Sequence, residues 1–214
     1  MSLKMQESYD KIAEEYAVRY NHELEHKPFD RQILKDFSEH VRGTGPVCDL
    51  GCGPGQIAQF LTDQGLHVTG VDLSPSMVRL ASQLHPNVHF EVGDMRVLKY
   101  EDNFMAGITA FYSIIHIERD DLPSVFTEFY RVLKPGGFLL FSIHLGFETV
   151  RIEELWGKAV DIDFLFFSVE EMESHVLSSG LEIVKISERG PYSENVEYQS
   201  QRAYFLCKKS EVIH

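Results

Sequence analysis

A glycine-rich turn between a predicted strand and a predicted helix constrains the fold of this chain more than any other feature. The segment VCDLGCGPGQIAQFL, residues 47–61, joins an apolar run to a helical pattern through three glycines spaced two apart. Glycine has no side chain, so such a turn can be tight and a ligand can approach its backbone closely. The next apolar run, VTGVD, ends in Asp72. The sequence therefore predicts a nucleoside site where the first strand ends.

Strand-like and helix-like segments alternate along the first two thirds of the chain. Apolar runs suited to strands lie at 46–50, 67–72, 88–92, 104–112 and 137–144, and helical patterns lie between them at 56–64, 75–84 and 121–133. Parallel strands need crossover helices, so this alternation predicts a doubly wound α/β sheet with helices on both faces. Two amphipathic helices within residues 5–42 precede the sheet and are predicted to form a helical lid. We expect residues 1–214 to form a single domain.

The pattern changes after the fifth predicted strand. Residues 145–168 contain the single tryptophan and a dense aromatic run that fits neither a helix nor a strand, and we interpret them as a cap. Ser168 followed by Glu171 indicates the N-cap of a helix that ends at Gly180. The last two apolar runs, 181–188 and 198–207, predict an antiparallel pair of strands.

Charge and cysteine content exclude several classes of partner. The chain carries 33 acidic and 20 basic residues, a formal charge of −13, and no basic run, so nucleic acid is not expected as a partner. No apolar run approaches the roughly 18 residues that a membrane span requires. Three cysteines without a secretory segment favour the reducing cytoplasm. Cys48 and Cys52 are interpreted as packing residues, and no metal is expected.

The spacing of the glycines argues against a nicotinamide dinucleotide. The dinucleotide fingerprint is G-x-G-x-x-G, and Gln56 stands where its third glycine belongs. Asp49, which precedes the turn, would repel a pyrophosphate but would attract the ammonium group of an amino-acid ligand. An NAD-dependent oxidoreductase therefore remains only a disfavoured alternative, and the ligand is predicted to be cationic.

Four motifs in order give the chain a resemblance to the class I S-adenosylmethionine-dependent methyltransferases. They are D-L-G-C-G-P-G at 49–55, V-D-L-S at 71–74 with Met77 after it, G-D-M at 93–95, and R-V-L-K-P-G-G-F at 131–138. The chain is similar to the small-molecule type, which includes ubiquinone and menaquinone biosynthesis enzymes. The resemblance implies a Rossmann-like seven-stranded sheet whose last strand is antiparallel. It also implies transfer of the sulfonium methyl group to a small organic acceptor by in-line displacement, which leaves S-adenosylhomocysteine.

The same resemblance implies roles for individual residues. Asp72 would accept hydrogen bonds from the ribose hydroxyls, Met77 would pack on adenine, and Asp94 would receive the adenine amine. The implied cofactor-binding set is Asp49, Gly51, Cys52, Gly53, Gly55, Asp72, Leu73, Met77, Asp94, Met95, Tyr112 and Ser113, with Tyr9 and Tyr16 from the first helix. A protein that binds the cofactor without catalysis remains an alternative.

Two histidines are candidates for a general base. His144 ends the fifth predicted strand and His116 lies just beyond the fourth. An unperturbed histidine has a pKa of about 6.5, which suits proton transfer near neutrality, although a histidine at a strand end can equally be structural. Acceptor-binding candidates are Trp156, Tyr192 and Arg202, together with the aromatic residues Phe147, Phe164 and Phe166 of the cap. The sequence specifies neither the acceptor nor the oligomeric state.

Overall fold

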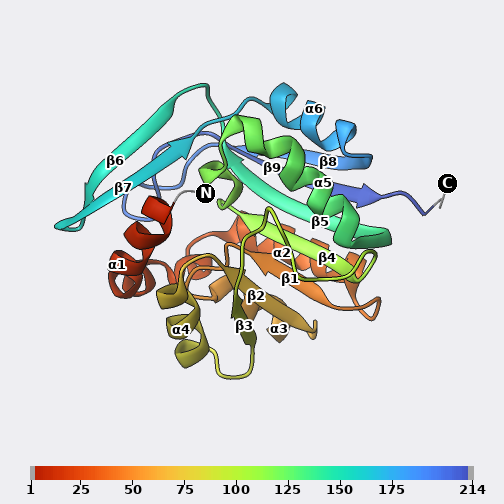
Figure 1. The fold of residues 1–214 in the computed structure, drawn as a ribbon, viewed down its shortest axis with the longest axis horizontal. Coiled ribbons are helices and arrows are strands. Elements are labelled where there is room, and N and C mark those ends of the chain that lie inside the picture. The colour runs from red at the N-terminus through yellow and green to blue at the C-terminus, as the bar shows by residue number, and fades with distance from the viewer. Residues whose placement is uncertain (1–2, 212–214) are drawn as a thin grey trace.

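A seven-stranded sheet forms the centre of the protein, in a computed structural model that describes residues 3–211. Its strands are β1 (Val47–Leu50), β2 (Val68–Asp72), β3 (His89–Val92), β4 (Met105–Phe111), β5 (Leu133–His144), β8 (Leu181–Arg189) and β9 (Arg202–Lys209). Their order is β3-β2-β1-β4-β5-β9-β8, and β9 runs antiparallel to both of its neighbours (Figure 1). The predicted architecture is therefore confirmed. The ends of the predicted domain, 1–2 and 212–214, lie outside the described residues.

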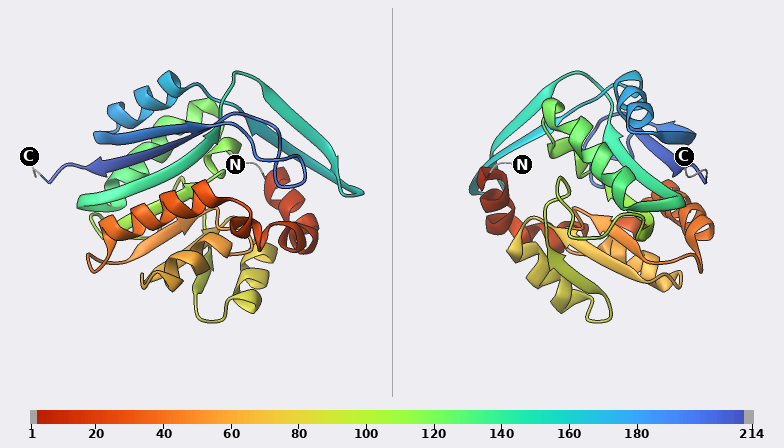
Figure 2. Two further views of the ribbon diagram at one scale, coloured as in Figure 1. Left: turned by 180° about the vertical axis from the view of Figure 1, so that it is seen from behind. Right: turned by 45° about the vertical axis from the view of Figure 1, so that its right-hand side comes forward.

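Helices cover both faces of the sheet (Figure 2). The helices α2 (Pro28–Val41), α3 (Gln56–Asp63) and α4 (Pro75–Leu84) share one core cluster, and α5 (Leu122–Val132) and α6 (Val169–Ser178) share the other. Phe37 of α2 and Phe126 of α5 are fully buried on opposite faces. Because α2 packs on the sheet, it does not belong to a lid. Of the lid predicted over 5–42, only the part before α2 lies away from the sheet. The described residues include no helix that is long and apolar enough to cross a bilayer.

The first helix, α1 (Leu3–Tyr20), lies beside the carboxyl ends of the parallel strands rather than on the sheet (Figure 1). Asp10 attaches it to the start of α4, because its carboxylate accepts hydrogen bonds from Ser74 Oγ at 2.5 Å and from the Ser76 amide at 2.9 Å. On the other side, Ser8 Oγ accepts a hydrogen bond from the Asp161 amide at 2.8 Å. The helix therefore bridges two segments that are far apart in sequence.

The segment interpreted as an irregular cap, 145–168, is instead a β-hairpin. Its strands are β6 (Thr149–Leu155) and β7 (Lys158–Leu165), paired antiparallel. Trp156 and Gly157 connect them with φ of 51° and 77°, and two successive positive φ values are typical of tight hairpin turns. Val160 and Ile162 pack against Ile12 of α1. The apolar alternation at 160, 162 and 164 was the period-two signal that the surrounding aromatic residues concealed.

The remaining sequence predictions for the C-terminal part are confirmed. Ser168 Oγ accepts a hydrogen bond from the Glu171 amide at 3.1 Å and caps α6, and Gly180 follows that helix with φ of 91°. Two boundaries differ by several residues. β9 begins at Arg202, not at 198, and β5 begins at Leu133, not at 137, because the Pro135–Gly137 segment is accommodated at a register shift in the pairing with β4.

Candidate functional site

The glycine turn after β1 combines close packing with open space. Gly51, Gly53 and Gly55 have φ of 69°, 52° and 90°. A Cβ on Gly51 would lie 2.3 Å from the Cβ of Ser113, whereas a Cβ on Gly53 would meet only Tyr16, at 3.8 Å. Gly51 is therefore required for packing, and Gly53 leaves its backbone accessible to a ligand.

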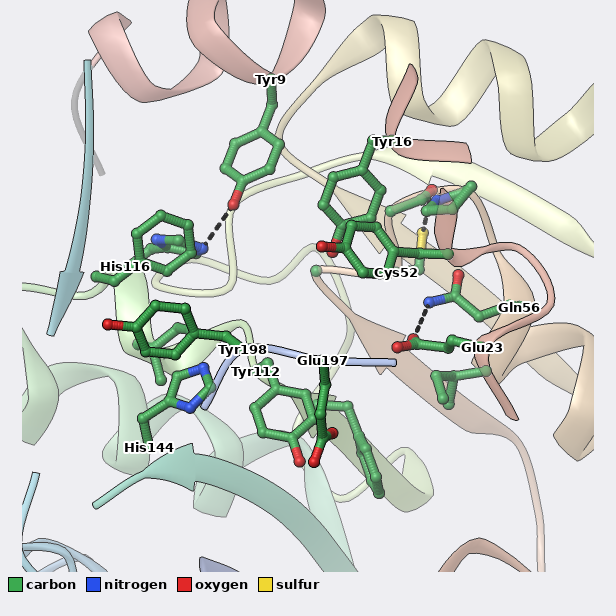
Figure 3. A pocket seen from close by; sticks show the side chains of 18 of the residues that line it. Tyr9, Tyr16, Glu23, Cys52, Gln56, Tyr112, His116, His144, Glu197 and Tyr198 are labelled. Atoms are coloured by element: carbon green, nitrogen blue, oxygen red, sulfur yellow. Dashed lines mark hydrogen bonds between the residues drawn. The ribbon is translucent and has the colours of Figure 1, made fainter. Parts of the chain in front are cut away.

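Two adjoining chambers lie at the carboxyl ends of the parallel strands. One has a volume of about 250 Å³ and the other of about 70 Å³. Both are lined by Tyr9, Tyr16, Gly51, Gly53, Phe111, Tyr112 and His116. The larger chamber extends between α1, the β6–β7 hairpin and the segment before β9, as Figure 3 shows in close view. The smaller chamber extends toward the end of β2 and the start of α4.

Asp72 is held rigidly in the smaller chamber. Its Oδ2 accepts a hydrogen bond from the Gly53 amide at 2.9 Å, and its Oδ1 accepts one from the Ser74 amide at 2.8 Å. Burial raises the pKa of this carboxyl above its usual range. Each carboxylate oxygen has two lone pairs, so both can accept a further hydrogen bond. Leu73, Met77 and Met95 line the same chamber.

Asp94 is placed differently from the role that the resemblance implied. Its carboxylate forms an ion pair with Arg96, with a shortest N···O distance of 2.7 Å, and Arg96 also contacts Asp121. Asp94 lines neither chamber, whereas its neighbours Gly93 and Met95 line the smaller one. The Asp94 carboxylate is thus engaged within the protein.

Asp49 is almost completely buried, with 1% of its surface exposed. Its Oδ1 accepts a hydrogen bond from Thr109 Oγ1 at 2.7 Å, and burial raises its pKa to about 7. Among the described side chains, three buried polar atoms lack a hydrogen-bond partner: Asp49 Oδ2, Gln56 Oε1 and Arg202 Nε. All three residues line the larger chamber. Unsatisfied buried polar groups are uncommon, so their concentration here indicates a site for a polar ligand.

His116 and Tyr9 form a hydrogen-bonded pair where the two chambers meet. The Nδ1 of His116 lies 2.9 Å from the Asp163 carbonyl oxygen, which can only accept, so Nδ1 carries the proton. The Nε2 atom consequently accepts the hydrogen bond from Tyr9 Oη, at 2.8 Å (Figure 3). Burial lowers the pKa of His116 to about 4. The imidazole is therefore neutral at physiological pH.

His144 is enclosed between aromatic rings at the end of β5. Its ring centroid lies 5.2 Å from that of Tyr112 and 5.2 Å from that of Phe166. Its Nδ1 pairs with Ser200 Oγ at 2.7 Å. Burial, together with the nearby Arg202, lowers its pKa to about 3. The expectation of a pKa near neutrality is thus wrong for both candidate bases, because each is removed from water.

The structure brings two of the three predicted acceptor-binding residues to the larger chamber. Trp156 lines it next to Tyr16, and Arg202 lines it with 2% of its surface exposed. Tyr192 does not line it, because its hydroxyl accepts a hydrogen bond from the Phe29 amide and its ring lies under Arg189. Phe147 is 83% exposed and does not line the chamber either. These two assignments are corrected.

Several polar residues of the larger chamber were not predicted from the sequence. Lys27 Nζ lies 2.5 Å from Glu23 and 3.5 Å from Glu197, and Gln56 Nε2 donates to Glu23 at 2.8 Å. The spacing of Glu23 and Lys27, four residues apart, was the available signal, but most such pairs lie on solvated surfaces. In residues 3–211 no group of three or more histidine, cysteine or acidic side chains is arranged to hold a metal ion.

Comparisons with known proteins agree on one kind of enzyme. Residues 47–137 match a family model described as a methyltransferase domain. The putative methyltransferase YqeM of Bacillus subtilis is 32% identical, with 94% of this chain and 99% of that protein covered. A demethylmenaquinone methyltransferase of Leptospira interrogans is 28% identical, with 82% of this chain and 72% of that protein covered. An S-adenosylmethionine-dependent methyltransferase structure from Clostridium acetobutylicum has a TM-score of 0.65 and 21% identity, with 94% of this chain and 99% of that one covered.

Proposed function

Since this chain belongs to the class I S-adenosylmethionine-dependent methyltransferases, we propose that it methylates a small, largely apolar organic acceptor bound in the larger chamber. The enclosure of that chamber carries the proposal. It is bounded by α1 and the β6–β7 hairpin, and its volume of about 250 Å³ suits a compact molecule. Apolar residues make up much of its wall: Phe111, Ile115, Val150, Ile152, Leu155, Trp156, Phe164 and Phe166.

The residues present fit the cofactor. S-adenosylmethionine supplies a methyl group on a sulfonium, which is already activated for displacement. In the smaller chamber, Asp72 offers acceptor oxygens for a ribose diol, and the Met77 and Met95 side chains offer apolar surface for a base. The accessible backbone at Gly53 and the unpaired oxygen of Asp49 lie beside the larger chamber, where the amino-acid portion would bind.

The main contribution of the protein to catalysis would be alignment and exclusion of water. In-line displacement requires the nucleophile, the methyl carbon and the sulfur to be collinear, and well-oriented reactants gain about 7–11 kcal/mol relative to free ones. The Tyr112 backbone has φ of 49° and its amide donates to Ser142 Oγ at 3.0 Å, which fixes the wall between the chambers. The α1 helix and the hairpin close the remaining sides.

Tyr9 and His116 provide a route for a proton when the acceptor must lose one. The Tyr9 oxygen would accept the acceptor's proton and pass its own hydroxyl proton to His116 Nε2, along the 2.8 Å hydrogen bond. His116 would become positively charged as the cofactor loses its positive charge, so the net charge of the buried site stays the same. His144 remains the second candidate, although its Nδ1 is engaged by Ser200.

A methyl-transfer assay tests the proposal when it compares the protein with a variant in which a larger side chain fills the larger chamber. Transfer of tritium from methyl-labelled S-adenosylmethionine is measured to a panel of one- and two-ring phenols, aromatic amines and quinols. We expect label in at least one compound, and loss of that transfer in Ile152→Trp with unchanged affinity for S-adenosylhomocysteine. Val184→Trp, on the exposed outer part of β8, serves as the control. Label that enters only protein or nucleic acid offered in the same assay would overturn the proposal.

A further inference from the structure

Two polar side chains face each other across β5 and β9 at one end of the larger chamber. His144, the last residue of β5, is opposite Arg202, the first residue of β9, in the antiparallel register. Both line the chamber and both lie against the ring of Tyr112, with the His144 centroid 5.2 Å and the Arg202 Cζ atom 5.5 Å from its centroid. Figure 3 shows His144 in the same part of the chamber as Tyr112, Tyr198 and Glu197.

The guanidinium of Arg202 is fixed by the segment before β9, and its Nε–H is left without a partner. Nη1 donates to the Ser200 carbonyl oxygen and Nη2 to the Tyr198 carbonyl oxygen, each at 2.8 Å. Nη1 also lies 3.2 Å from Glu197 Oε1. The buried Nε atom has no hydrogen-bond partner in the described part of the chain. Because buried donors are nearly always paired, this one indicates that a ligand supplies an acceptor at this end of the chamber.

The imidazole of His144 offers a second donor. Its Nδ1 lies 2.7 Å from Ser200 Oγ, and no described residue forms a hydrogen bond to its Nε2, which is accessible from the chamber. We assign the serine hydroxyl as the donor to Nδ1, which satisfies the hydroxyl proton and leaves the imidazole proton on Nε2. Burial and the nearby Arg202 lower the pKa of His144 to about 3, so the ring carries only this proton. Its tautomer is the opposite of that of His116.

The charges around these donors favour a neutral ligand. Three acidic side chains line the chamber: Glu23, Asp49 and Glu197. Its two basic side chains, Lys27 and Arg202, already pair with carboxylates, at 2.5 Å and 3.2 Å. A ligand carboxylate would therefore lose its hydration without gaining an uncommitted cation among the described residues that line this chamber. A neutral carbonyl oxygen loses less hydration, and its two lone pairs can accept from both donors.

We propose that the Nε2–H of His144 and the Nε–H of Arg202 bind a neutral, carbonyl-type oxygen of the methyl acceptor. This role rests on the proposed function, since it requires the acceptor to occupy the larger chamber. It narrows the acceptor to an uncharged molecule that carries a hydrogen-bond-accepting oxygen. A neutral imidazole with its proton on Nε2 cannot take up a proton there, so the proton route belongs to Tyr9 and His116.

Fluorine NMR titrations of three ring compounds of similar size test this role on the unaltered protein, with saturating S-adenosylhomocysteine. The probes are para-fluoroacetophenone, para-fluoroethylbenzene, which has a methylene in place of the carbonyl, and para-fluorobenzoate. We expect the ketone to bind about tenfold more tightly than either of the others. A ketone that does not bind, or that binds no more tightly than the ethyl compound or the benzoate, would overturn the inference.

Substitutions assign the selectivity to the two donors. His144→Phe keeps a stacked ring without the nitrogens, and should weaken binding of the ketone by about three- to tenfold with little change for the ethyl compound. Arg202→Lys keeps the charge but removes Nε, and should cause a loss of the same kind. His175→Phe is the matched control, because its ring stacks on Phe126 and does not line the chamber. Equal weakening of both probes by His144→Phe, or of neither, would contradict the assignment.

Two further measurements separate this inference from the proposed function. Nitrogen-15 NMR of the unaltered protein should show His144 as the Nε2–H tautomer, and the Nδ1–H tautomer would overturn the inference even if a variant does not fold. Ile152→Trp, which fills the chamber, should abolish binding of the ketone and of the ethyl compound. Equal affinity of these two probes, with both lost in Ile152→Trp, would overturn only the donor pair. Binding that survives Ile152→Trp would contradict the proposed acceptor chamber itself.

Discussion

At the scale of single residues, burial controls the protonation of the groups around the two chambers. Asp49 is the clearest case, because removal from water raises its pKa to about 7, while an ammonium ligand would favour its charged form. Ligand binding should therefore release a proton below pH 7 and none well above it. The affinity of a ligand that carries an ammonium group should rise with pH in that range.

Titrations of S-adenosylhomocysteine between pH 5.5 and 8 test this prediction. We expect the affinity to fall by up to about tenfold for each unit below pH 7 and to level off above it, since the ligand binds the ionised carboxylate. Asp49→Asn should bind more weakly at pH 8 and show little dependence on pH. If the affinity of Asp49→Asn for S-adenosylhomocysteine still falls as the pH is lowered, the dependence is assigned to Asp72, because burial raises the pKa of that carboxyl as well.

The two candidate bases should remain neutral far below the usual range for histidine. Burial lowers the pKa of His116 to about 4 and that of His144 to about 3, so both imidazoles are mostly neutral at pH 5 and above. Nitrogen-15 NMR of labelled protein should show His116 as the Nδ1–H tautomer from pH 5 to 8. A titration of His116 centred near 6.5 would contradict the structure at this pair.

Motif spacing located some residues of the site and not others. Asp72, Met77 and the glycines are fixed by their distance from a strand end, which the sequence shows directly. The surroundings of His144 depend on Ser200 and Phe166, which approach it only through tertiary folding. The misassignment of Tyr192 has the same cause, since nothing near it in sequence indicates its contact with Phe29.

At the scale of elements, the turn after β1 depends on the absence of one Cβ. Gly51 and Gly43 have nearly the same positive φ, 69° and 70°, but a Cβ on Gly43 would meet nothing within 4 Å. Gly43→Ala should cost about 1–2 kcal/mol of unfolding free energy, from backbone strain alone. Gly51→Ala should cost a further 1–3 kcal/mol or so, because its Cβ collides with Ser113. Urea denaturation measures both, and equal losses would contradict the packing described for this turn.

Elements were predictable where one periodicity was undisturbed. The parallel strands are short apolar runs between clear helical patterns, so their positions were found to within a few residues. The β6–β7 hairpin was missed because its inward-facing side chains pack on α1 and not on the main sheet. Its aromatic content therefore resembled an irregular cap.

At the scale of the whole molecule, the sheet order follows from the alternation of strands and helices, but the chambers do not. They exist because α1 and the hairpin, about 150 residues apart, meet over the strand ends, where Lys158 Nζ pairs with Glu15 at 2.9 Å and Tyr16 packs on Trp156. A single chain thereby encloses two adjoining chambers, a smaller one near β2 that contains Asp72 and a larger one under the hairpin.

A crystal structure of the protein with bound S-adenosylhomocysteine would show directly how the two chambers divide cofactor and acceptor. We expect the ribose hydroxyls within hydrogen-bonding distance of Asp72, the base between Met77 and Met95, and the sulfur at the junction near Tyr9 and His116, with space left under the hairpin. A nucleoside bound under Trp156, with Asp72 making no contact to it, would contradict this division of the two chambers.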